Sequence, residues 1–216
     1  MAIIQNPTQE SLLDDLTYKS KKQMFSTEVT PEMLEKLTHR QLETISAVQT
    51  ANQLFNEQDT GLTDISDFMT NLAMQESNIG RDKEWSGSSS PFQIDPIRYQ
   101  DLQSKSLAGE QTTIDRASLA NKLLGLDSRY GKGVDILNLS DKERRDPLIG
   151  SLLTRMALAN IPESIPVDLT GQAHYWKDYW NTHAKNAKGK PSDFINQVQF
   201  YNKMLNVKTY DNTPIK

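Results

Sequence analysis

The chain has 216 residues, of which 36% are hydrophobic and 24% are charged, and its formal net charge is −4. This length and composition favour a folded globular protein over a disordered one, with room for one large domain or one domain plus an extension. Cysteine is absent, which excludes disulfides, thiolate catalysis and cysteine metal sites, and fits a protein made in a reducing cytoplasm.

Charge and hydropathy exclude further classes of binding partner and location. The lysines and arginines are scattered and the net charge is mildly negative, so we expect no nucleic-acid partner. The N-terminus has no basic region followed by a long apolar run, and no apolar run approaches the roughly 18 residues of a membrane span. We therefore predict neither an export signal nor a membrane span. His39, His174 and His183 have no ligand spacing, so we expect no metal and no other cofactor.

The first part of the chain predicts two helices. Residues 8–24 place leucines on one side and end in lysines, which suit the negative end of a helix. A Thr-Pro-Glu triplet at 30–32 has the order of an N-cap, a first-turn proline and a first-turn acid, and predicts a helix to about residue 56. Residues 58–63 then break the pattern. We interpret residues 1–58 as a helical arm or a first layer.

The next predicted helix carries an acid on its apolar face. The apolar residues between Ile65 and Leu72 form one stripe, and Glu76 continues it four residues later. A carboxyl group desolvated on that face resists ionisation, so its pKa should rise and it can serve as a general acid. Alternatively the helix ends at Asn78 or Gly80, and Glu76 is a solvated residue of its last turn.

The stretch after Glu76 predicts the only β structure. Residues 81–90 lose the helical period, and a serine-proline turn leads into the apolar alternation of Phe92 and Ile94. We expect a small hairpin or looped wall in which Gln93 points away from its two neighbours. Gln93 could then bind substrate or orient Glu76, or it could be an ordinary solvent-facing strand residue.

The rest of the chain reads as helices that begin at cap and proline signals. They are predicted over residues 96–102, 113–124, 146–158, 172–181 and 191–205. The helix over 146–158 has the strongest apolar stripe, and we expect it in the core. Convincing strands are nearly absent, so the predicted fold is mainly α.

Four aromatic residues in the predicted helix over 172–181 offer flat faces to a sugar ring. Tyr175 and Tyr179 share one helix face, and Trp176 and Trp180 share the adjacent one. Aromatics at helical spacing usually belong to the core, so we expect one pair to be buried and the other to line a groove.

The order of these pieces resembles the lysozyme-like soluble lytic transglycosylases. Glu76-Ser77 is similar to the Glu-Ser pair that ends a helix in that family, and Phe92-Gln93-Ile94 is similar to the short strand that walls its sugar groove. The helix starting at Asp146-Pro147 resembles the family's next core helix, and residues 173–182 resemble the tails of bacteriophage members. The resemblance covers about residues 60–202.

The resemblance implies a domain organisation and a reaction. It implies a lysozyme-like α+β domain over residues 59–205, with the arm before it and a tail over 206–216. It implies cleavage of the β-1,4 bond between N-acetylmuramic acid and N-acetylglucosamine in peptidoglycan, with Glu76 as the one catalytic carboxyl group. The substrate-binding residues that it implies are Ser77, Ser90, Phe92, Gln93, Tyr175 and Trp176.

Two features depart from the family pattern. Ser90 stands where the family strand has a glycine, and Ala173-His174-Tyr175 is the nearest match to its Ala-Tyr-Asn motif. Two alternatives therefore stay open. One is a hydrolytic muramidase or endolysin of the same fold, which would need a second carboxylate such as Asp82, Glu84 or Asp95. The other is an inactive structural tail or adaptor protein.

The resemblance to bacteriophage members suggests where the protein would act. Without an export signal, such a protein is made in the host cytoplasm and reaches the wall in the virion during entry, or through a holin at lysis. We expect a virion component that acts in the host periplasm or cell wall. The helical arm would dock it to other virion or tail proteins.

Overall fold

The computed structural model of the chain describes residues 36–57, 62–81, 90–182 and 189–205. In chain order the elements are α3 (His39–Glu57), α4 (Ser66–Ser77), α5 (Pro96–Leu107), α6 (Gln111–Leu126), η1 (Ile136–Asn138), η2 (Glu143–Arg145), α7 (Pro147–Leu158), α8 (Leu169–Tyr175), η3 (Trp176–Trp180) and α9 (Pro191–Met204). The described residues contain no strand, so the mainly α prediction is confirmed at that level.

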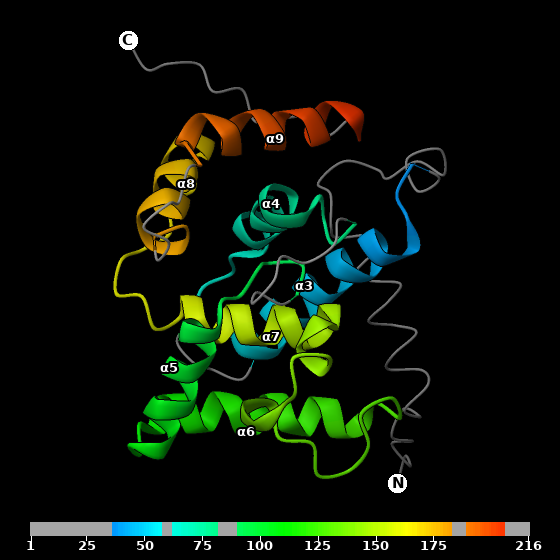
Figure 1. The fold of residues 1–216 in the computed structure, drawn as a ribbon, viewed down its shortest axis with the longest axis vertical. Coiled ribbons are helices and arrows are strands. Elements are labelled where there is room, and N and C mark those ends of the chain that lie inside the picture. Colours follow the sequence, from blue (N-terminus) through cyan, green and yellow to red (C-terminus); the bar gives the residue numbers. More distant parts are fainter. Residues whose placement is uncertain (1–35, 58–61, 82–89, 183–188, 206–216) are drawn as a thin grey trace, which may run out of the picture.

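Two helices, α3 and α7, form the centre of the molecule (Figure 1). Nearly every residue of α7 is buried, in agreement with its sequence stripe. The residues of α3 with no exposed surface include Val48, Ala51 and Phe55, which belong to the same hydrophobic core. Residues 39–57 therefore belong to the same core as the rest of the chain and form a first layer. Residues 1–35 of the expected arm lie outside the described residues.

The start of α3 differs from the prediction. The helix begins at His39, whereas the sequence suggested a continuous helix from the triplet at 30–32, which lies outside the described residues. A turn at 36–37 is followed by a capping box, in which Gln41 N donates to Thr38 Oγ1 at 3.3 Å and Thr38 N donates to Gln41 Oε1 at 2.9 Å. This capping box sets the start of α3 at His39.

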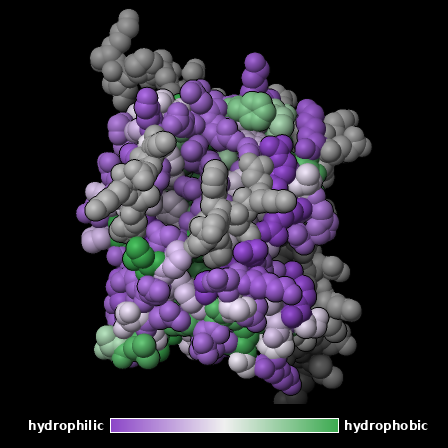
Figure 2. All heavy atoms as spheres, in the orientation of Figure 1, coloured by the Kyte–Doolittle hydropathy of each residue, from purple (hydrophilic) through white to green (hydrophobic). Residues whose placement is uncertain are grey.

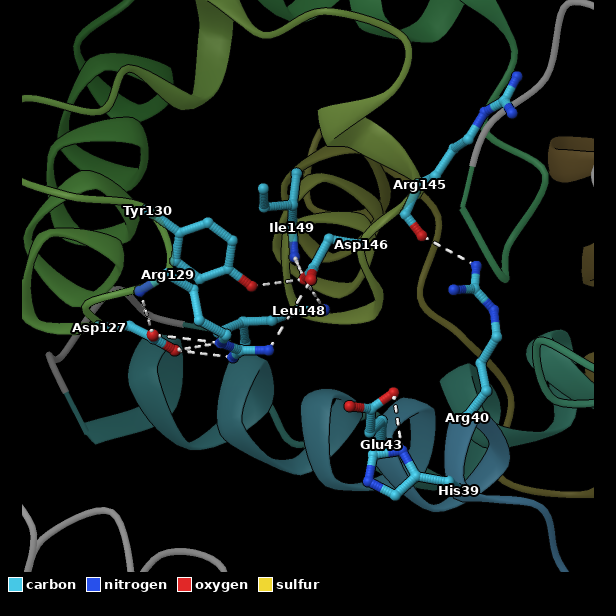
Figure 3. A network of polar contacts seen from close by, with 10 residues as sticks. All are labelled: His39, Arg40, Glu43, Asp127, Arg129, Tyr130, Arg145, Asp146, Leu148 and Ile149. Carbon is cyan, nitrogen blue, oxygen red and sulfur yellow. Dashed lines mark hydrogen bonds and ion pairs between the residues drawn. The ribbon is translucent and has the colours of Figure 1, made fainter.

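Side chains of α3 hold the end of α4 in place. Arg40 Nε donates to Gly80 O at 2.8 Å, and Gln41 Nε2 donates to Asn78 O at 2.9 Å. Arg40 Nη2 also donates to Arg145 O at 3.0 Å (Figure 3). Asn78 ends α4 in the left-handed conformation, with φ 51°. The last turn of α4, which contains Glu76, is therefore fixed from outside the helix.

The predicted strand Phe92–Ile94 is a turn in the structure. Gln93 has a left-handed backbone with φ 52°, and its N–H donates to Ser90 O at 3.2 Å. Only Ile94 is in a β-bridge, and the remainder of the expected hairpin, 82–89, lies outside the described residues. The strand alternation that placed Gln93 opposite its neighbours therefore does not apply.

The start of α7 is tied down by a polar network (Figure 3). Asp146 Oδ1 accepts from Leu148 N at 2.8 Å and from Ile149 N at 3.2 Å, as the sequence signal Asp-Pro indicated. The same oxygen accepts from Tyr130 Oη at 2.6 Å. The loop that contains Tyr130 is thereby anchored to the central helix.

The predicted helix over 172–181 divides into two kinds of helix. Residues Leu169–Tyr175 form α8, and Trp176–Trp180 continue as the π-helical turn η3, in which Asn181 N donates to Trp176 O at 2.8 Å. The wider turn changes which side chains share a face. Tyr175, Trp176 and Trp180 are all buried, and only Tyr179 is partly exposed, so the expected division into one buried pair and one open pair is wrong.

The surface on the face shown in Figure 2 is mostly hydrophilic. Among the described residues, the large exposed hydrophobic side chains are Ile97 and Leu107 at the two ends of α5, Leu126, Val167 and Phe200. Among the described helices, none combines the length and the apolar character needed to cross a bilayer.

Candidate active site

The candidate site is centred on Glu76, in the last turn of α4. Leu72 and Ala73 of the same helix have no exposed surface, and Glu76 itself is half-buried. The apolar stripe therefore does continue onto the acid, while the helix also ends there at Ser77. The helix thus ends close to Glu76, but the expectation of a solvated last-turn residue is wrong, because other elements partly cover the carboxyl group.

Trp176 makes the closest contact to the acid. Its indole Nε1 donates a hydrogen bond to Glu76 Oε1 at 2.6 Å. Trp176 is only 2% exposed and packs against Phe194 of α9, with ring centroids 5.6 Å apart. The sequence suggested Trp176 as a stacking surface for a sugar. In the structure its ring is in the core, and its N–H is what the acid contacts.

Arg98 is a member of the site that sequence reasoning missed. It lies in the first turn of α5, and its Nη2 donates to the carbonyl oxygens of Tyr179 and Trp180 at 2.5 and 2.8 Å. Its guanidinium group also lies over the Trp180 ring, 4.3 Å from the centroid. No motif links residue 98 to residue 76, because only folding brings α5 against the end of η3.

Burial dominates the electrostatics of Glu76. Loss of water around the carboxyl group raises its pKa to about 7, because the charged form is penalised. The Trp176 hydrogen bond and the positive charge of Arg98 act in the opposite direction and lower the pKa. Burial is the larger effect, so at neutral pH the group is present in both protonation states.

The charge on Arg98 is balanced from two sides. Burial lowers the pKa of its guanidinium group, while Asp95 and Glu76 raise it. Asp95 Oδ2 lies 3.8 Å from Arg98 Nε, and Asp95 Oδ1 accepts from Arg98 N at 2.8 Å as the cap of α5. Asp95, one of the candidates for a second catalytic carboxylate, is thus engaged as a helix cap and ion-pair partner. The other two, Asp82 and Glu84, lie outside the described residues.

Ser77 serves the frame of the site. Its Oγ donates to Pro91 O at 2.6 Å and accepts from Gly80 N at 2.6 Å. It is 2% exposed, so the side chain is directed into the protein. Ser77 therefore joins the end of α4 to the 90–94 turn, and it is not presented to a ligand in this conformation.

Two further residues suggested as substrate ligands are completely buried. Ser90 and Phe92 have no exposed surface. Ser90 has φ 73°, and it packs so tightly on α7 that a Cβ added at Gly150 would lie 2.3 Å from Ser90 Cβ. A side chain at Gly150 would therefore displace the turn. The contact gives Ser90 a packing role, in a left-handed conformation that glycine adopts more readily than serine.

Gln93 and Tyr175 occupy different surroundings. Gln93 is partly exposed, and its side chain is placed by the left-handed turn at 90–93. Tyr175 is 3% exposed, and its ring packs edge-on against Phe68 with centroids 5.4 Å apart. Its hydroxyl is buried and has no hydrogen-bond partner in the described part of the chain. Burial raises the pKa of that hydroxyl to about 12, so it stays a potential donor.

A cavity of about 660 Å³ lies elsewhere, between α5, α6 and the segment 133–138. Gln103, Ala117 and Leu137 are among the residues that line it, and neither Glu76 nor its contacts do. Within the described ranges, no three His, Asp or Glu side chains come close enough together to hold a metal ion.

The chemistry available at the site is proton transfer. A partly buried carboxyl group with a pKa of about 7 can give up a proton and take one back near neutral pH. Comparisons with models of protein families, with curated protein sequences and with solved structures found no match for this chain.

Proposed function

We propose that the protein is a peptidoglycan lytic transglycosylase in which Glu76 is the catalytic acid. The observation that carries this proposal is the half-buried Glu76 carboxyl group, whose pKa is raised to about 7 and whose Oε1 accepts from the Trp176 indole. Cleavage of a glycosidic bond needs a proton on the leaving oxygen, and a carboxyl group that is still protonated near neutral pH supplies it. The resemblance in sequence order to soluble lytic transglycosylases supplies the substrate.

The proposed reaction uses one carboxyl group twice. Glu76 protonates the oxygen between N-acetylmuramic acid and N-acetylglucosamine, and the bond from C1 of the muramic acid to that oxygen breaks. The C6 hydroxyl of the same muramic acid then attacks C1 and returns its proton to Glu76, which closes a 1,6-anhydro ring. A pKa near neutrality suits both steps, because the group must be a good acid first and a good base second.

The single-acid route is favoured by the surroundings of Glu76. Among the described residues, the one charged group that affects its pKa is Arg98, which is positive. Asp95 is committed to the cap of α5 and to Arg98. A two-carboxylate hydrolysis would need a second free acid about 5 to 10 Å from the first.

Digestion of purified peptidoglycan tests the proposal. We expect the wild-type protein to release products that end in 1,6-anhydromuramic acid by mass spectrometry, and Glu76→Gln to lose at least about 100-fold in rate. Glu43→Gln is the matched control, because Glu43 is an exposed glutamate of α3 whose ion-pair partner among the described residues is His39. Reducing ends would instead identify a hydrolytic muramidase. No release by the wild type would indicate a structural protein without activity.

The place of action is a separate part of the proposal and depends on the sequence alone. A chain that resembles bacteriophage members fits a virion component that opens the wall during entry, with residues from the arm as its docking element. Mass spectrometry of purified particles tests this directly. Detection only in the lysate would favour an endolysin.

A further inference from the structure

We propose that Trp176 decides which oxygen of Glu76 carries the acidic proton: its indole N–H holds Oε1, so the proton resides on Oε2. Trp176 would then be a positioning residue of the active site. The catalytic consequence depends on the proposed function, whereas the placement of the proton does not.

An indole N–H fixes the direction of its hydrogen bond. The N–H of tryptophan donates and cannot accept, so Glu76 Oε1 must be the acceptor in the 2.6 Å contact. In a protonated carboxyl group the carbonyl oxygen accepts a hydrogen bond better than the hydroxyl oxygen does. The indole therefore favours the form in which Oε1 is the carbonyl oxygen. The proton is left on Oε2, the oxygen that would meet the leaving group.

The indole is held too firmly to follow another arrangement. Trp176 packs against Phe194 of α9, and a Cβ added at Gly189 would lie 2.5 Å from the ring carbon Cη2 of Trp176. The far end of its π-helical turn is fixed by Arg98, which donates to the carbonyl oxygens of Tyr179 and Trp180. Parts of α5, η3 and α9 thus set the direction of one N–H bond.

Trp180 provides a comparison within the same turn. It is also buried, at 5% exposure, and its Nε1 also donates, but to the neutral carbonyl oxygen of Phe92 at 3.1 Å. Within one turn, the Trp176 indole therefore donates to a group that titrates, and the Trp180 indole donates to a group that does not. The third tryptophan, Trp85, lies outside the described residues.

Charged groups of the described residues act on this bond mainly from α5. Arg98 acts on Glu76, and Asp95 and Asp101 act on Arg98. From α8, the Tyr175 hydroxyl interacts with Arg98, and α9 contributes the apolar ring of Phe194. When Glu76 ionises, the Trp176 bond becomes charge-assisted and stronger, so the indole proton reports the ionisation of this acid.

A pH titration of the indole N–H resonances of the full-length wild-type protein tests the proposal by NMR. We expect the Trp176 resonance to shift with a midpoint near pH 7, in line with the acid that it contacts, and the Trp180 resonance to stay constant. In Glu76→Gln, the Trp176 resonance should no longer titrate. A Trp176 resonance that is constant between about pH 5 and 9 in the wild type overturns the proposal.

Two matched variants extend the test to catalysis. In Trp176→Phe the ring remains but the donor is lost, so the titration midpoint of the Glu76 side-chain carbon should rise by about one pH unit. In the pH–rate profile, the fall in rate at high pH should move upward by the same amount. The value of kcat should fall by about tenfold or more, because the proton is no longer directed to Oε2. Trp180→Phe should leave the midpoint and the pH of that fall in place.

The outcomes separate this inference from the proposed function. If the wild type cleaves no peptidoglycan but the Trp176 resonance titrates with Glu76, the function is wrong and the proton placement stands. If the wild type is active and Trp176→Phe keeps the wild-type midpoint, Trp176 only fills space and the inference is wrong.

Discussion

Two acidic residues at opposite ends of two helices show how the surroundings of a carboxyl group decide its role. Asp146 precedes α7 and accepts hydrogen bonds from Leu148 N, Ile149 N and Tyr130 Oη. Glu76 lies in the last turn of α4, and within the described part of the chain it accepts from the Trp176 indole alone. The first carboxylate meets the positive end of a helix and the second the negative end.

The difference explains why only one of them suits proton transfer. Asp146 accepts from two N–H groups of the α7 N-terminus and from one hydroxyl, and it therefore serves as a helix cap. Glu76 has lost water and gained one donor, so its ionisation is disfavoured and its pKa rises to about 7. Asp146 is therefore expected to stabilise the folded state, whereas ionised Glu76 is expected to destabilise it and to serve proton transfer instead.

The largest effect on stability is expected at the cap. Asp146→Ala should lower the free energy of unfolding by about 2–3 kcal/mol, because two helix N–H groups and the Tyr130 hydroxyl lose their acceptor. Urea denaturation measures the loss. Asp168→Ala is the control: within the described ranges it removes a cap with the single acceptor bond from Gly171 N, and it should cost about 1 kcal/mol. Equal losses in the two variants would contradict the special role of Asp146.

Glu76→Gln should instead raise the free energy of unfolding, and only at high pH. The folded-state pKa of Glu76 is raised, so the folded state binds more protons than the unfolded state between the ordinary glutamate pKa and about pH 7. The stability due to the protonated group is complete below that window and is lost as pH rises through it. The variant should therefore match the wild type near pH 4 and exceed it by about 2 kcal/mol at pH 8.

Urea denaturation of both proteins across this pH range measures that difference. A variant that is no more stable than the wild type at pH 8 would show that Glu76 ionises without penalty. The comparison with Asp146 would then lose its basis, and so would the general-acid role.

Ser77 tests whether the residue next to the acid acts on structure. Ser77→Ala removes the donor to Pro91 O and the acceptor of Gly80 N, and should cost about 1–2 kcal/mol in the free energy of unfolding. Ser104→Ala, at an exposed position of α5, is the control and should change it by less than about 0.5 kcal/mol. A neutral Ser77→Ala would reopen a role for this hydroxyl in binding substrate.

The smallest effect is expected at the edge of the Asp146 network. Tyr130→Phe removes one of three donors to a carboxylate that keeps its helix contacts, and should cost about 1 kcal/mol. Release of peptidoglycan fragments should be unchanged, because Tyr130 contacts no residue of the Glu76 site in the described structure. Loss of activity without loss of stability would link the two regions, which the comparison does not predict.

Cap and proline signals in the sequence predicted the helix ends well where those ends depend on residues close together in the chain. The pairs Asp95-Pro96 and Asp146-Pro147 start α5 and α7 as expected, and Asn78 ends α4. The signals failed where tertiary packing competes. The turn at 90–94 replaces a predicted strand because Ser90 must fit against Gly150, and the π-helical turn changes the face of each aromatic residue.

The candidate site rests on Glu76, which its place on an apolar stripe singled out. The reaction that the order of the later helices suggested stays a prediction. The roles of the neighbours of Glu76 were assigned differently: Ser77 and Ser90 support the frame, and Trp176 donates to the acid instead of offering a stacking face. Arg98 could not have been found, because its contacts are to backbone carbonyl groups that any residue could provide.

The sequence by itself determined that Glu76 lies in the last turn of an apolar helix, because helical period and termination depend on residues within a few positions of one another. Only the tertiary structure decided whether that acid would be solvated. Its hydrogen-bond partner lies 100 residues further along the chain, and the loss of water that raises its pKa results from several elements packing together. The ionisation of a side chain depends on everything near it in space, and that information appears only when the chain is folded.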